Sequence, residues 1–127
     1  MLPPHSAGHA VGVTVRQDDD AFVLGVSGDL DLESIAPLVT ALAEAGGAGE
    51  GPVVLDLSGV GFADSSTVNV LLRAHSELGP RLRIARPSAF VERLFDVIGL
   101  RQALPVYDTV EDALVRGSSD PAAVREP

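Results

Sequence analysis

The stretch VVLDLSGVGFADSSTVNVLL, residues 53–72, decides the fold of this chain. It opens as an apolar run broken only by Asp56, which is typical of a strand covered on both faces. A glycine-containing turn over residues 58–63 then leads to the polar residues DSST at 64–67, where we expect a helix to begin. Apolar residues recur at helical spacing from Val68 to Leu78. The stretch therefore predicts a central strand, a turn and a helix.

Outward from this stretch, strand-like and helix-like segments alternate. On the N-terminal side, residues 11–15 and 21–27 predict a hairpin around the acidic turn 18–20. Ser34 is a plausible N-cap for a helix that carries Ile35, Leu38 and Leu42 at helical spacing and ends near Gly46. This side of the chain therefore predicts two antiparallel strands and one helix.

On the C-terminal side, residues 82–85 predict a short strand. Ser88 is expected to cap a helix that ends at Gly99 and whose inner face is Val91, Leu94, Phe95 and Ile98. Residues 104–107 predict a last strand. Thr109 and Asp112 then resemble a capping box that opens a helix through Val115.

This order predicts the fold class α/β, as a single domain. The sheet is mixed and mostly parallel, an antiparallel hairpin opens it, and about four helices pack against it. We expect the domain to span residues 11–116, between a flexible leader (1–10) and a flexible tail (117–127).

Composition excludes several classes of function. A net charge of -9 on 127 residues repels nucleic acid and anionic lipid, and no stretch predicts a membrane span or signal peptide, so we expect a cytoplasmic protein. The chain has no Cys, and all nine basic residues are Arg. A thiolate nucleophile, a Cys-ligated zinc ion, a Schiff base and a Walker loop are therefore excluded.

Residues 64–67 are the main candidates for a functional site. Capping alone explains one or two of these side chains, because a helix start leaves unpaired N–H groups. A phosphate on one of the hydroxyls would also be favoured there by the helix dipole. Capping is the more common of the two roles, and the residues alone leave both open.

Several spaced motifs resemble the STAS-domain family, the bacterial anti-sigma factor antagonists. The resemblance covers most of the chain and rests on DLSGVGFADSS (56–66), GDLDL (28–32), ARPS (85–88), the helix at 91–98 and PVYD (105–108). It implies a binding module, not an enzyme, with no cofactor. The unphosphorylated domain would bind an anti-sigma factor that is also a serine kinase, and so release a sigma factor.

The resemblance also implies the site residues. Phosphorylation would fall on Ser66 and end the interaction, and a serine phosphatase would reset it. Partner binding would involve the acceptor region Asp64, Ser65, Ser66 and Thr67 together with the loop residues Gly28, Asp29 and Asp31. From the charge and the residues themselves, we expect no nucleic acid, membrane or metal ion to take part.

Two positions depart from the family pattern. The family commonly has Gly after the acceptor serine and often a small residue two further on, where this chain has Thr67 and Asn69. Gly would allow a kinase backbone to approach closely. Thr67 is therefore an alternative acceptor, and a non-switching STAS scaffolding protein that is not phosphorylated here is the alternative function.

Other readings of single residues are weaker. A phosphoacceptor role for Asp56 requires a lysine that the chain lacks, so we expect a hydrogen-bonded residue at the end of the strand. His75 lies nine residues after Ser66, about 13 Å along a helix, too far to act as its base. The acidic turn 18–20 is expected to be solvated rather than metal-bound. Phe62, with Val60, either belongs to the docking surface or fills the core.

Overall fold

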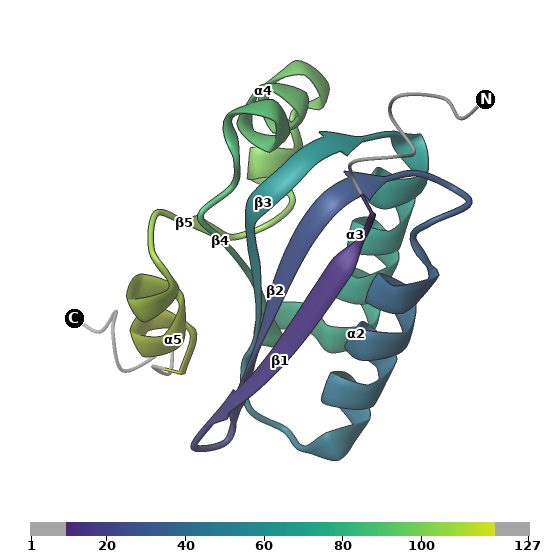
Figure 1. Ribbon diagram of the computed structural model, residues 1–127. Helices are drawn as coiled ribbons and strands as arrows, with labels where there is room; N and C mark the ends of the chain where they lie inside the picture. Colours follow the sequence, from purple (N-terminus) through teal and green to yellow (C-terminus); the bar gives the residue numbers. More distant parts are fainter. Residues whose placement is uncertain (1–9, 119–127) are drawn as a thin grey trace.

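The computed structural model describes residues 10–118, which form one five-stranded mixed sheet with helices on both faces (Figure 1). The strand order is β1-β2-β3-β4-β5. Strands β1 (Gly12–Asp18) and β2 (Ala21–Leu30) pair antiparallel as the predicted hairpin. Strands β3 (Val53–Ala63), β4 (Leu82–Ala85) and β5 (Val106–Tyr107) continue the sheet in parallel from β2. The predicted fold class is confirmed.

Two helices cover one face of the sheet. Helix α2 (Ala36–Ala48) buries Leu38, Ala41, Leu42 and Ala45, and helix α3 (Ser65–Leu78) buries Thr67, Leu71 and Ala74 (Figure 1). The main apolar cluster lies between these helices and the inward residues of β2 and β3. Helix α4 (Ala89–Ile98) adds Val91 and Phe95 to the same cluster.

A smaller cluster lies on the opposite face. Helix α5 (Val110–Ser118) packs Val110 and Ala113 against Val23, Val54 and Ala85. Two short 3₁₀ turns, Gly79–Arg81 and Leu100–Gln102, precede β4 and β5. Within residues 10–118, no helix combines the length and apolarity needed to cross a membrane.

The helix caps mostly agree with the sequence. Ser88 accepts a hydrogen bond from the Val91 N–H at 3.2 Å, and Thr109 Oγ1 accepts one from the Asp112 N–H at 2.9 Å. Gly99 ends α4 with φ +73°. The prediction for Ser34 is wrong: α2 has no side-chain cap, since Ile35 takes the cap position and the Ser34 hydroxyl bonds inside the preceding turn.

Residues 58–63 are not a turn. They continue β3 as far as Ala63. Val60 and Ala63 are both buried, which breaks the regular alternation of a strand, and shifts in the β2–β3 register accompany this irregularity. A Cβ on Gly59 would lie 2.9 Å from the Ser27 Cβ, so glycine allows the two strands to approach here. The last strand is shorter than predicted.

The described helices and strands extend from Gly12 to Ser118. Nine of the ten residues of the expected leader, and residues 119–127 of the expected tail, lie outside the described residues.

Candidate partner-binding site at the start of helix α3

The candidate site lies where β2 and β3 end side by side. Because these strands are parallel, their carboxyl ends meet at one edge of the sheet, and Asp29 pairs with Phe62 while Leu30 pairs with Ala63. Helix α3 begins directly after β3, and the loop to α2 begins directly after β2. This topology brings together all the predicted site residues, from Gly28 to Asp31 and from Phe62 to Thr67.

Asp64 is the N-cap of α3. Its Oδ1 accepts a hydrogen bond from the Ser66 N–H at 2.9 Å, and its own N–H donates to the Leu30 carbonyl at 3.2 Å. One residue therefore both starts the helix and joins it to the end of β2. The capping role that the sequence predicts for this segment is present.

The three hydroxyls at the helix start have different surroundings. Ser65 is exposed and Ser66 is half-buried. Thr67 is only 4% exposed, and its Oγ1 donates to the Leu30 carbonyl at 3.3 Å. Thr67 therefore points into the structure, where it links α3 to β2, and its hydroxyl is already used.

The neighbouring loop is held by its own side chains. Asp31 Oδ1 accepts hydrogen bonds from the N–H groups of Glu33 and Ser34, at 3.1 and 3.0 Å. The Ser34 hydroxyl lies 2.8 Å from Asp31 Oδ1 and 2.9 Å from the Asp29 carbonyl oxygen. The sequence predicts a loop at Gly28 and Asp29, but both residues lie in β2 and pair with β3; Gly28 has φ +99°, a conformation that few side chains adopt. Asp31 therefore shapes the loop beside the helix start.

An aromatic pair borders the same edge. Phe62 is 42% exposed, and its ring centroid lies 5.4 Å from that of Phe90, in the first turn of α4. Val60, by contrast, is buried at 1% exposed. Of the two roles left open for these residues, the core role thus holds for Val60, while Phe62 lies on the surface.

Two contacts at this edge were missed by the sequence reasoning. The Ser88 hydroxyl donates to the Val60 carbonyl at 2.6 Å, which fixes the start of α4 beside the end of β3. Phe90 completes the aromatic pair. An apolar residue at an exposed position in the first turn of a helix is the only signal in the sequence that could have indicated Phe90.

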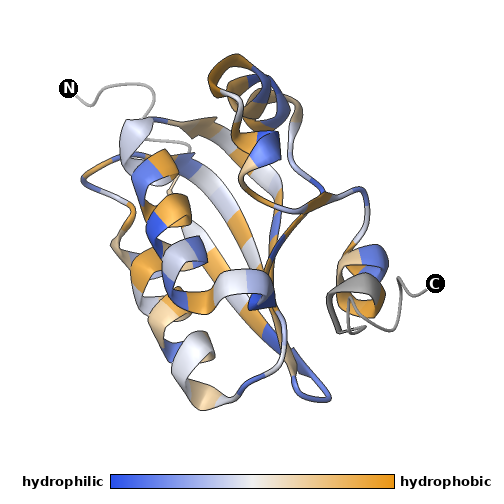
Figure 2. Cartoon of the chain, turned by 180° about the vertical axis from the view of Figure 1, so that it is seen from behind, coloured by the Kyte–Doolittle hydropathy of each residue, from blue (hydrophilic) through white to orange (hydrophobic). Residues whose placement is uncertain are grey.

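The residues weighed for catalysis or metal binding have ordinary structural roles. Asp56 Oδ1 accepts a hydrogen bond from the Ser58 N–H at 3.0 Å, and Oδ2 lies 3.5 Å from Arg86 Nη1. The carboxylate is hydrogen-bonded as expected, but Asp56 lies within β3 and not at its end, because the strand continues to Ala63. Asp19 and Asp20 are exposed in a hydrophilic hairpin turn (Figure 2). Among residues 10–118, no group of three His, Asp or Glu side chains could hold a metal ion.

The chain is similar to proteins of one family over almost its whole length. The family model described as "Mlab, STAS domain" matches residues 13–114. The anti-sigma-F factor antagonist RsfB of Mycobacterium tuberculosis is 31% identical over 117 residues, which cover 88% of this chain and 95% of the relative.

Solved structures have the same fold. An anti-sigma factor antagonist from Mycobacterium paratuberculosis matches with a TM-score of 0.79 at 24% identity, covering 94% of this chain and 100% of that one. The Bacillus cell fate determinant SpoIIAA in its phosphorylated form matches with a TM-score of 0.62 at 22% identity, covering 83% and 98%. The chain therefore belongs to the STAS-domain family of anti-sigma factor antagonists.

Proposed function

We propose that this protein is an anti-sigma factor antagonist that acts by partner switching. With Ser66 unphosphorylated, the edge formed by the start of α3, residues 28–31 at and after the end of β2, and Phe62 binds a kinase-type anti-sigma factor and releases a sigma factor. Phosphorylation of Ser66 by that kinase ends the interaction, and a serine phosphatase restores it. The protein is a cytoplasmic binding module without catalytic activity of its own, and neither nucleic acid nor a membrane takes part.

One observation carries this proposal. Ser66 is half-buried in the first turn of α3, whose start is fixed by the Asp64 cap and the Asp64–Leu30 hydrogen bond, and Phe62 at the end of β3 is exposed. A partner that recognises this surface would contact the Ser66 hydroxyl and the Phe62 ring together. Aromatic side chains commonly contribute strongly to binding at such surfaces.

Electrostatics supports the direction of the switch. A phosphoserine adds about -1.5 to -2 charges, here beside Asp64 on a protein whose net charge is already -9. The helix dipole favours the phosphate, so the fold would be kept. A partner surface built around a neutral hydroxyl would instead have to bury that charge. A loss of about 3 to 4 kcal/mol, several hundredfold in affinity, is enough to abolish a submicromolar complex.

The environment of the hydroxyls favours Ser66 over Thr67 as the acceptor. The Thr67 hydroxyl is buried and bonded to the Leu30 carbonyl, and a kinase could reach it only after the first turn of α3 had opened. The bulk of Thr67 also points inward, away from an approaching kinase backbone. Thr67, which stands where the family commonly has Gly, should therefore hinder phosphorylation of Ser66 less than the sequence alone suggests.

Binding by matched variants tests this function. The wild type, Ser66→Asp and Ser66→Ala would each be immobilised and exposed to host lysate, and the bound anti-sigma kinase would be quantified by mass spectrometry. We expect Ser66→Asp to lose at least about a hundredfold in binding and Ser66→Ala to bind like the wild type. Ser65→Asp, one residue away, shows whether any added charge at the helix start has the same effect. Undiminished binding by Ser66→Asp would contradict the proposal.

A scaffolding role without a switch is the second candidate. Asn69 is exposed on α3, one turn beyond Ser65 and Ser66, where the family often has a small residue. A side chain there could keep a kinase from the acceptor while leaving other contacts intact. In that case Ser66→Asp and the wild type would bind the same partners, and Ser66 would carry no phosphate in the host.

A further inference from the structure

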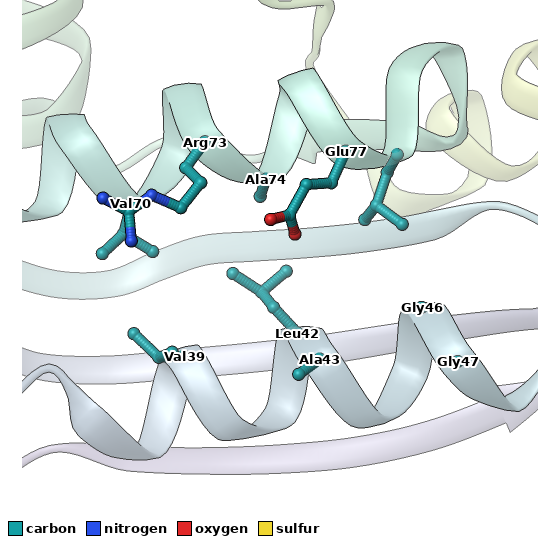
Figure 3. Close-up of a pocket in the computed structure, with 10 residues that line it drawn as sticks. Val39, Leu42, Ala43, Gly46, Gly47, Val70, Arg73, Ala74 and Glu77 are labelled. Atoms are coloured by element: carbon teal, nitrogen blue, oxygen red, sulfur yellow. The ribbon is translucent and has the colours of Figure 1, made fainter.

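A groove of about 480 Å³ separates α2 from α3 (Figure 3). Val39 and Leu42 line it from α2, and Val70 and Ala74 line it from α3. Ala43 of α2 and Ala74 of α3 have short side chains along it, and Gly47 faces open space, whereas Gly46 is in close contact with Leu78. Its volume is within the range of about 300 to 1,000 Å³ that is typical of sites for small organic molecules.

Two opposite charges stand on one wall of this groove. Among residues 10–118, Arg73 and Glu77 are the charged residues that line it, and they lie one turn apart on α3. Figure 3 shows the Glu77 carboxylate pointing toward the α2 side of the space, and Arg73 one turn earlier on the same helix. Both groups therefore border the same apolar space.

Neither charge is used within the described chain. No ion pair or side-chain hydrogen bond joins Arg73 or Glu77 to each other or to another residue among 10–118. The order also matters, since an acidic residue four positions before a basic one pairs better along a helix than the reverse order found here. Both groups are therefore available to a ligand.

We propose that this groove binds a small zwitterion with an apolar body, of about the size of an apolar dipeptide. The ligand carboxylate would pair with the guanidinium of Arg73, and its ammonium group with the carboxylate of Glu77. The apolar body would cover Val39, Leu42 and Val70, and so remove their surfaces from water. This inference does not rest on the proposed partner switching, because the site uses the later turns of α3.

The charge of the protein helps to select this class of ligand. A net charge of -9, together with Glu77 in the groove, opposes an anionic ligand such as a fatty acid. Arg73 opposes a ligand that carries only positive charge. A zwitterion satisfies both side chains at once and leaves no charge unpaired beside the apolar lining.

The test is a titration of the isotope-labelled full chain with L-leucyl-L-leucine, followed by amide NMR shifts. We expect saturable shifts in the groove-lining residues of α2 and α3. The variants Arg73→Gln and Glu77→Gln should each bind about tenfold more weakly or worse. Arg93→Gln, an exposed arginine of α4 outside the groove, is the matched control and should bind like the wild type. The same spectra show that each variant is folded.

A blocked ligand separates charge recognition from apolar burial. N-acetyl-L-leucyl-L-leucine amide has the same apolar body and neither charge, and we expect it to bind at least about tenfold more weakly. Equal binding of the blocked and free dipeptides would overturn the proposal, as would unchanged binding by both groove variants. The absence of saturable groove shifts at millimolar dipeptide would also overturn it.

Discussion

At the scale of single residues, the start of α3 shows how one carbonyl group organises the candidate site. The Leu30 carbonyl accepts hydrogen bonds from both the Asp64 N–H and the Thr67 hydroxyl, at 3.2 and 3.3 Å. Two strands and a helix therefore meet at one buried acceptor. Ser66, between these two donors in sequence, keeps its hydroxyl free of this network.

Thr67→Val tests this role of Thr67. The change keeps the shape of the side chain and removes the buried hydroxyl, and we expect unfolding to require about 1 kcal/mol less free energy. Urea denaturation measures the effect. Thr40→Val, at an exposed position of α2, is the control and should change stability by less than about 0.5 kcal/mol. Equal effects at the two positions would show that the Thr67 bond contributes nothing.

At the scale of elements, Arg81 joins the end of α2 to the segment before β4. Its guanidinium donates to the carbonyls of Gly46, Gly49 and Gly51, at 3.3, 2.7 and 2.9 Å. Gly46 belongs to the last turn of α2, where carbonyls lack partners within the helix, and Gly49 and Gly51 follow that turn. The glycine-rich end of α2 is therefore held by a residue about thirty positions away.

Arg81→Ala should release this end of α2. We expect a loss of about 1 to 3 kcal/mol in unfolding free energy. Relative to the wild type, amide exchange should become faster in the last turn of α2 and change less in α3. Urea denaturation and hydrogen exchange measure these two effects. Arg16→Ala, an exposed residue of β1, controls for the loss of an arginine side chain. Unchanged amide exchange in α2 would show that Arg81 does not hold the end of this helix.

The elements also show what can be predicted from the sequence. The Ser88 cap, the Gly99 stop and the Asp64 start were predicted because caps depend on residues within one turn. The strand through 58–63 was missed, because its pairing depends on β2, far away in sequence. Ser34 was misassigned for a similar reason: its hydroxyl has closer partners in Asp29 and Asp31 than in the helix.

The same distinction applies to the candidate site. Residues 64–67 could be predicted as site residues from their position between a strand and a helix. Residues 28–31 could be predicted from the family resemblance. The aromatic partner of Phe62 could not, because α4 reaches it only through the tertiary fold. The burial of Thr67 likewise depends on the position of β2 rather than on any local pattern.

At the scale of the whole molecule, one apolar cluster joins the sheet to α2, α3 and α4. Phe95 is among the largest fully buried side chains of this cluster and is 1% exposed. Helix α4, which carries Phe95 on its inner face, also carries Phe90 at the proposed docking edge. Core packing therefore positions part of the site.

Phe95→Ala should lower the unfolding free energy by about 3 to 5 kcal/mol, because it leaves a cavity in the core. Phe90→Ala, in the same helix but 37% exposed, should cost about 1 kcal/mol, since it loses only surface packing with Phe62. Chemical denaturation of both variants checks the contrast. If the two substitutions cost the same, the assignment of the inner face of α4 is wrong.

Ser66 is the proposed switch residue of this protein. The most direct measurement is phosphopeptide mass spectrometry on the protein recovered from its host during growth and under stress, with site assignment across residues 64–69. We predict phosphate on Ser66, with an occupancy that changes with condition, and none on the buried Thr67. A fully covered peptide without phosphate on Ser66 under any condition would contradict the account and favour the scaffolding role.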